Sequence, residues 1–134
     1  MMLSADRNTP RTDSTSFSDL VAAATVIYSG ALVALDVSGN AVPASATVAQ
    51  RTRGVAQTRA DNSAGAAGDI RVNVRTGTYR LDNSAAADLI TVADIGAVCY
   101  VVDDETVAKT DAAGTRPVAG TIRNVDADGV WVEI

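Results

Sequence analysis

The clearest constraint on the fold is an alternation of apolar and polar residues in the stretch DIRVNVRTGTYRL, residues 69–81. Ile70, Val72 and Val74 fall on one face of an extended chain, because successive side chains of a strand point to opposite faces. Gly77 interrupts this period. The pattern predicts a half-buried strand followed by a bulge or sharp bend at the glycine.

Short apolar runs separated by turn residues continue through most of the chain from residue 21 onward. Ser38, Gly39 and Asn40 predict a tight hairpin, because glycine and asparagine tolerate the positive φ that such turns require. The stretch 116–134 predicts a closing hairpin. A short helical turn is expected after Thr91, a residue type that caps exposed backbone amides.

Two further patterns complete the expected fold. Thr47 and Gln50 have the spacing of a capping box, which predicts a single helical turn. The run AVCYVV, residues 97–102, is apolar on both faces and predicts a strand inside a sheet. The fold class expected is therefore mainly β, a compact antiparallel β-sandwich or barrel of about eight strands with one or two short helices and an extended N-terminal arm.

The patterned part of the chain begins at residue 21, and 134 residues is the length of one ordinary domain. We therefore expect a single β domain over residues 21–134. Residues 1–20 are rich in Ser, Thr, Asp and Arg and have no apolar period, which predicts a flexible or extended N-terminal arm. Such a segment is either a loose terminus or an arm that orders on a partner. The residues expected to make contact in the second case are Leu3, Arg7, Pro10, Arg11 and Phe17.

The net charge of −5 argues against nucleic acid or an anionic membrane as partner, because both are bound by clustered Lys and Arg. Cys99 is the one cysteine, so no intrachain disulfide can form. The first 19 residues lack the basic and apolar regions of a signal peptide, and no apolar run is long enough for a membrane helix. These features predict synthesis and folding in a cytoplasm.

No histidine occurs in the sequence, which removes the usual general base, the serine triad and most transition-metal sites. The residues Asp103, Asp104 and Glu105 lie between two apolar runs, which predicts a solvated hairpin tip. They lack the ligand spacing of a calcium loop, which argues against a metal site. Cys99 lies in an apolar run, as a core thiol does. We therefore expect no catalytic residue, no metal, no cofactor and no enzymatic activity.

Trp131 is the only tryptophan, and the alternation of the last strand separates it from Val130 and Val132. One interpretation is that it packs under a loop or under the N-terminal arm. The other is that it belongs to a subunit interface, where tryptophan is enriched. We keep Trp131 as the candidate interface residue.

A family resemblance is carried by several stretches of the chain. In the C-terminal half they are ITVADIGAVCYVVDDETVAKT (90–110) and RPVAGTIRNVDADGVWVEI (116–134). In the first half they are YSGALVALDVSGNAVPA (28–44), RGVAQTRA (53–60) and GDIRVNVRTGTY (68–79). Taken together, residues 21–134 resemble the capsid cement, or head decoration, proteins of tailed phages.

Members of that family are small β-rich domains that attach to the outside of an assembled phage head and stabilise it, commonly as trimers. The resemblance implies that the major capsid protein and further copies of the same chain are the partners, with no role for nucleic acid or membrane. It also implies a place on the outer surface of the virion after synthesis in the cytoplasm of a host bacterium. The family provides no catalytic residues to transfer.

The alternative is a carbohydrate- or receptor-binding module of a virion or bacterial surface structure. Sugar sites usually stack rings on exposed aromatic side chains, and aromatic residues make up only 4% of this sequence. Capsid decoration is therefore the function that we expect.

Overall fold

The computed structural model describes all residues 1–134 and is mainly β, as the alternation predicts. The strands are β1 (Ser16–Leu20), β2 (Thr25–Ile27), β3 (Leu32–Leu35), β4 (Ala41–Pro43), β5 (Arg51–Ala56), β6 (Ala60–Asn62), β7 (Arg71–Arg75), β8 (Thr78–Leu81), β9 (Val98–Val101), β10 (Val107–Ala108), β11 (Val118–Asp126) and β12 (Gly129–Glu133). Helical structure is limited to two 3-10 turns, η1 (Ala86–Asp88) and η2 (Val92–Asp94). The chain contains no helix with the length and apolarity needed to span a membrane.

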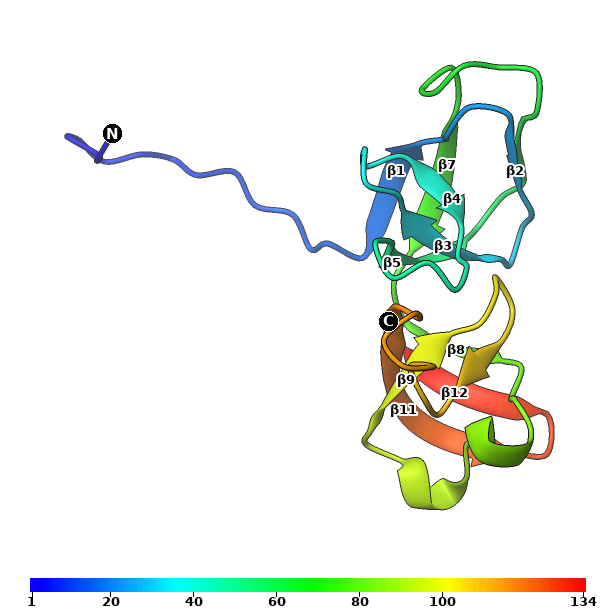
Figure 1. Ribbon diagram of the computed structural model, residues 1–134. Coiled ribbons are helices and arrows are strands. Elements are labelled where there is room, and N and C mark those ends of the chain that lie inside the picture. The colour runs from blue at the N-terminus through cyan, green and yellow to red at the C-terminus, as the bar shows by residue number, and fades with distance from the viewer.

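The strands form two five-stranded antiparallel sheets, stacked one above the other in Figure 1. The first sheet has the order β1-β7-β5-β3-β4 and the second has the order β10-β9-β11-β12-β8. The chain passes from one to the other between β7 and β8, so Gly77 marks the sharp bend that the sequence predicts. We call residues 16–76 the first half and residues 77–134 the second half. A small ribbon of β2 and β6 belongs to the first half.

Both sheets curl until their edges meet. Val21, which follows β1, forms a parallel bridge with Ala41 at the start of β4. Asp82, which follows β8, forms the same kind of bridge with Thr106 just before β10. Each half is therefore a small barrel-like sheet whose edges touch at one point.

The two halves share one strand connectivity. In each, the first strand bridges the third, the second strand pairs with the third and the fourth, and the fifth strand pairs with the fourth and the first. The corresponding strands are β1, β3, β4, β5 and β7 in the first half and β8 to β12 in the second. The expected inner strand at residues 97–102 is confirmed as β9, which lies between β10 and β11. The molecule is thus built from one five-stranded unit used twice.

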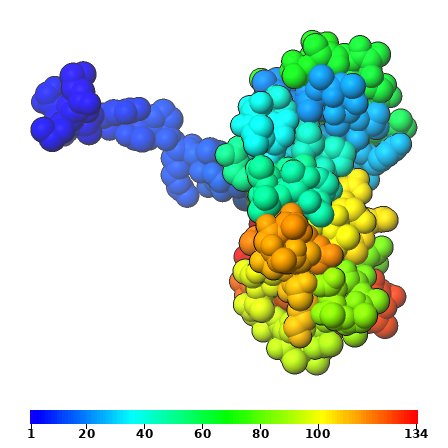
Figure 2. Space-filling view, viewed as in Figure 1, coloured from blue at the N-terminus to red at the C-terminus, as the bar shows by residue number.

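The apolar residues form two clusters, and one of them spans both halves. The first cluster lies entirely within the first half and contains nine buried residues. The second cluster contains 13 buried residues, and Leu32, Ala34, Ala44 and Val55 of the first half contribute to it. Because these four side chains pack among residues of the second half, the halves share a continuous core, and Figure 2 shows them in contact.

Hydrogen bonds connect the halves as well. The Leu32 amide donates to the carbonyl of Asp104 at 2.7 Å, and the Thr52 hydroxyl donates to the carbonyl of Val118 at 2.6 Å. These bonds satisfy groups that would otherwise be desolvated without a partner at the junction.

Two local expectations are corrected by the structure. Thr47 and Gln50 do not start a helix; the Gln50 side chain instead accepts a hydrogen bond from the Ser45 amide at 3.0 Å, which closes a turn. The expected arm of residues 1–20 is shorter, because residues 16–20 form β1 and pair with β7 along their whole length. Phe17 is therefore a sheet residue and not part of the arm.

Candidate interaction site: the N-terminal arm and strand β1

Residues 1–15 form an extended segment that projects from the first half, as Figures 1 and 2 show. Every residue in it is exposed, including the expected contact residues Leu3, Arg7, Pro10 and Arg11. Its one ion pair joins Arg11 and Asp13 at 3.4 Å, and both side chains are more than four-fifths exposed. An exposed pair of this kind contributes little to ordering the segment. The side chains of the arm are therefore exposed and almost free of contacts with the rest of the chain.

Strand β1 holds the base of this arm in place. The guanidinium of Arg53 lies 3.4 Å from the centroid of the Phe17 ring, and it donates two hydrogen bonds to Asp19 at 2.9 and 3.0 Å. Arg53 is the extra residue of a β-bulge, since Val33 pairs with Gly54 while the next residue, Ala34, pairs with Thr52. A bulge redirects a side chain, and here it aims the arginine at β1.

Trp131 lies in β12 and is half-buried. Its indole N–H donates to a carboxylate oxygen of Asp126 at 2.9 Å, and the guanidinium of Arg80 lies 5.9 Å from the ring. The tryptophan thus stabilises the β11–β12 hairpin through its bond to Asp126 and does not contact the arm. Its role in a subunit interface stays a prediction.

The acidic run Asp103, Asp104 and Glu105 forms the loop between β9 and β10, as its flanking apolar runs predict. Its backbone makes the structural contacts: the Asp104 carbonyl accepts from Leu32, and the Glu105 carbonyl accepts from Asp82 at 2.8 Å. The Asp103 carboxylate accepts from the Glu105 amide at 3.0 Å within the loop. The run therefore joins β8 and the first half through main-chain atoms. In the chain as a whole, no three His, Cys, Asp or Glu side chains are grouped so that they could hold a metal ion.

Cys99 is fully buried in β9, and burial raises the pKa of its thiol to about 11. The thiol donates a weak hydrogen bond to the Gly120 carbonyl at 3.7 Å. A thiol with this pKa is neutral at physiological pH and is a poor nucleophile. Cys99 therefore packs as a small apolar side chain.

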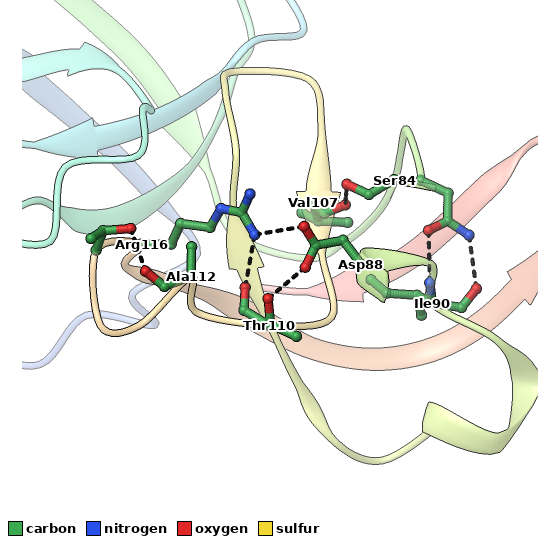
Figure 3. A network of polar contacts seen from close by, with 9 residues as sticks. Ser84, Asp88, Ile90, Val107, Thr110, Ala112 and Arg116 are labelled. Carbon is green, nitrogen blue, oxygen red and sulfur yellow. Dashed lines mark hydrogen bonds and ion pairs between the residues drawn. The ribbon is translucent and has the colours of Figure 1, made fainter. Parts of the chain in front are cut away.

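A polar network that sequence patterns do not reveal fixes the connections on either side of β9 and β10 (Figure 3). The Asp88 carboxylate accepts hydrogen bonds from the Thr110 hydroxyl and, at 3.1 Å, from Arg116. Asn83 bonds both the amide and the carbonyl of Ile90, at 3.0 and 2.8 Å. The hydrogen bond from Thr110, followed by that from Arg116, holds the pKa of the Asp88 carboxyl below its ordinary value. The folded protein therefore favours the charged form of the Asp88 carboxyl.

Hydrogen bonds to Asp88 and to two further aspartates predict acid sensitivity. The pKa values of Asp88, Asp94 and Asp126 are all lowered, chiefly by hydrogen bonds from Thr110, from the Thr91 amide and from Trp131, respectively. A folded pKa below the unfolded value of about 3.9 stabilises the protein above that pH, and this contribution is lost as the pH falls through the folded value. The free energy of unfolding, measured with urea, should stay level from about pH 7 to 5 and fall below about pH 4.

Asp88→Asn should lower the stability at pH 7 and make the acid dependence shallower, because it removes one of the groups that bind protons on unfolding. Asp111→Asn is the matched control, since the Asp111 side chain accepts no hydrogen bond and lies in the same loop region. Equal acid profiles for the two variants would contradict this interpretation.

A second feature that the sequence analysis did not single out is Tyr28, which is 58% exposed. It borders an open hollow of about 440 Å³ at the junction of the halves, together with Ser29, Asp104 and Glu105. The Arg59 guanidinium lies 5.2 Å from the ring centroid. The sequence gives little indication that Tyr28 is exposed, because its position after a short apolar run is typical of a core aromatic residue.

Comparison of the chain with models of protein families, with curated proteins and with solved structures found no match.

Proposed function

We propose that this protein is a structural decoration protein, which binds the outer surface of a phage head at the junctions between capsomers and stabilises the shell. The support comes from the resemblance of residues 21–134 to cement proteins and from the shape of the molecule. The partners are the major capsid protein and other copies of the chain, assembled as a trimer. The protein acts on the virion surface without catalysis, after synthesis in the bacterial cytoplasm.

The observation that carries this proposal is the pairing of a wholly exposed arm with a firmly held base. Residues 1–15 contact almost nothing in their own fold, whereas β1 is fixed by its pairing with β7 and by the Arg53 contacts to Phe17 and Asp19. An extended segment can lie along a partner and bury its side chains there. In this mechanism Leu3, Arg7, Pro10 and Arg11 contact the shell.

Multivalency makes modest contacts sufficient. A trimer that engages several shell subunits converts later binding steps into intramolecular ones, so the combined affinity greatly exceeds that of one arm. A contact of about 800 Å² on each partner is a standard size for a specific interface. Trp131, which is half-buried and lies in the last strand, is the residue that we assign to the contacts between copies.

Deleting residues 1–14 should leave the fold intact and reduce attachment to phage heads by about tenfold or more, because the avidity of the trimer depends on each arm. Thr15 is kept because its carbonyl accepts from the Thr76 amide at 3.0 Å. Circular dichroism checks the fold, and cosedimentation with expanded and unexpanded heads measures attachment. The intact protein should prefer expanded heads, whose junctions a rigid body can bridge.

The matched control keeps the length and composition of the arm but scrambles the order of residues 1–14. Loss of attachment with both variants supports specific contacts along the arm. Unchanged occupancy after the deletion would remove the arm from the mechanism, and failure of the intact protein to bind any head would overturn the proposed function.

The alternative, a carbohydrate- or receptor-binding module, is favoured by one observation. Tyr28 is exposed beside Asp104 and Glu105 in an open hollow, and an aromatic ring next to carboxylates can stack on and hydrogen-bond a sugar. Arg59 lies over this ring and competes for it. Glycan binding that Tyr28→Ala abolishes would support this alternative over capsid decoration.

A further inference from the structure

The cationic side chains without an ion-pair partner are concentrated in the first sheet. Ion pairs with carboxylates engage seven of the 11 Lys and Arg residues. The other four are Arg7 in the arm, Arg51 on β5, and Arg71 and Arg75 on β7. Arg71 and Arg75 are exposed and lie on one face of β7, because they are four positions apart in the strand. Two positive charges without an ion-pair partner thus lie on one face of β7, with Asn73 between them, in a protein of net charge −5.

A serine of β1 lies between Arg75 and the border of the sheet, whereas Leu20 lies opposite Arg71. Ser16 pairs with Arg75, and Ser18 pairs with Asn73, so both serines share the face of the arginines. A serine leaves room for a long side chain to extend across β1. Arg71 already does so, since it donates to the Ser18 carbonyl at 2.7 Å.

The outer edge of β1 is open for backbone pairing except at the Ser18 carbonyl, which accepts from Arg71. The Gln57 amide donates to the Asn73 carbonyl at 2.8 Å, so Asn73 directs its backbone groups toward β5. Two opposite residues of an antiparallel pair point their backbone groups either both toward each other or both away from each other. Because Asn73 points its groups away from β1, Ser18 points its N–H and C=O away from β7. Ser16 does the same, two positions earlier. Strand β4, at the other edge of the curled sheet, does not cover these groups, because its bridge on this side is to Val21, which follows β1.

This edge also lacks the usual protection against pairing. Edge strands are commonly guarded by Lys, by Pro or by an unpaired charge that points inward. The sequence of β1, SFSDL, contains no Lys or Pro, and its inward charge, Asp19, is neutralised by Arg53. The strand therefore remains able to accept a neighbour.

We propose that the free edge of β1 binds an extended segment of a partner protein that carries two carboxylates four residues apart. The segment adds to the first sheet as a sixth strand, and the outward N–H and C=O of Ser16 and the N–H of Ser18 supply hydrogen bonds, while the Ser18 carbonyl already accepts from Arg71. Arg71 and Arg75 are about 13 Å apart along β7, at roughly 3.3 Å per residue, so carboxylates at positions i and i+4 of the segment match them. Backbone pairing provides affinity, and the two arginines provide selection by charge-assisted hydrogen bonds. The proposal does not depend on whether the partner is a phage shell.

The test uses the full-length protein and a synthetic peptide, acetyl-Val-Glu-Val-Thr-Val-Glu-Val-amide, whose two glutamates lie on one face four residues apart. Titration followed by amide NMR should shift the signals of Ser16 and Ser18 first. Replacing both glutamates with glutamine should weaken binding about tenfold, and so should moving one glutamate to the adjacent position, which places it on the opposite face. Binding of the glutamate peptide should weaken as salt rises from about 0.05 to 0.5 M.

Two variants locate the site on the protein. Arg71→Gln with Arg75→Gln should weaken binding of the glutamate peptide about tenfold and leave the glutamine peptide unchanged. Arg51→Gln is the matched control, because Arg51 is also exposed in the first sheet and has no ion-pair partner. It lies opposite Leu35 of β3, away from β1. Ser18→Pro should block the edge, since proline removes an N–H that the fold does not use. A peptide N-methylated at alternate residues tests the same point without altering the protein.

Equal binding of all the peptides, or binding unaffected by the arginine substitutions, would overturn the proposal. It would also be overturned if the glutamate peptide did not bind, or if light scattering showed that Ser18→Pro converts an oligomer into a monomer. In that last case a second copy of the chain would occupy the edge.

Discussion

Leu32→Ala is expected to destabilise the protein by about 2–5 kcal/mol, the cost of removing a large aliphatic side chain from a well-packed core. Leu32 is fully buried and belongs to the cluster that spans both halves. The substitution opens a cavity at the junction, and the Leu32 amide, which donates to Asp104 across that junction, keeps the backbone from moving in to fill it. Urea unfolding at pH 7, followed by circular dichroism and Trp131 fluorescence, measures the loss.

Leu35→Ala is the matched control in the same strand. Leu35 is only half-buried and packs at the margin of the cluster within the first half. Its truncation should cost about 1 kcal/mol, because less apolar surface returns to water. A loss at Leu32 no larger than that at Leu35 would show that the junction does not couple the halves.

Much of the fold could be predicted because local side-chain patterns determine it. The alternation around β7 is confirmed: Val72 and Val74 are buried, while Arg71 and Arg75 are exposed. Gly77 is confirmed as a bend, and the turn residues at 38–40 are confirmed as the hairpin between β3 and β4. Each of these features depends on residues within a few positions of one another.

Strand β1 could not be predicted, because its stability comes from a distant part of the chain. Asp19 occupies an inward position where an apolar residue is expected, so residues 16–20 show no apolar period. The charge is accommodated only because Arg53, 34 positions away, donates two hydrogen bonds to it. That contact in turn requires the bulge in β5, which no local pattern of β1 reveals.

The repeated connectivity of the two halves was also hidden in the sequence. The first half inserts β2 and β6 between strands that are consecutive in the second half, which changes the spacing. The clearest shared position is a glycine: Gly54 in β5 and Gly120 in β11 each follow the extra residue of a bulge. One glycine in each half is too little to identify a repeat from sequence alone.

The candidate site was predictable in part for the same reason. The arm was recognisable because residues 1–15 have no apolar period, and absence of a pattern is a local property. The free edge of β1 depends on which strands pair, and the two arginines of β7 lack an ion pair because the carboxylates pair with other cations. Both are set by the tertiary fold.

Gly120→Ala is expected to cost about 3 kcal/mol or more, as overpacking against a rigid backbone does. A Cβ at this position would overlap the Glu133 carbonyl and approach Val132 Cγ1 to 2.9 Å. The carbonyl belongs to β12, the neighbouring strand, so it can move only if β11 and β12 separate. Because these strands contribute Ile122, Val130 and Val132 to the shared core, the separation also disturbs buried packing.

Gly39→Ala separates this steric effect from the general cost of replacing a glycine. Gly39 has a φ of +83° in the hairpin turn between β3 and β4, and a Cβ there would meet no atom within 4 Å. Its substitution should cost only about 1–2 kcal/mol, the strain of a left-handed conformation. Thermal and urea unfolding of both variants should therefore show the larger loss at Gly120, although Gly39 carries the positive φ. Equal losses would mean that β12 yields to the added methyl group, and that close contact between β11 and β12 is not what requires glycine at this bulge.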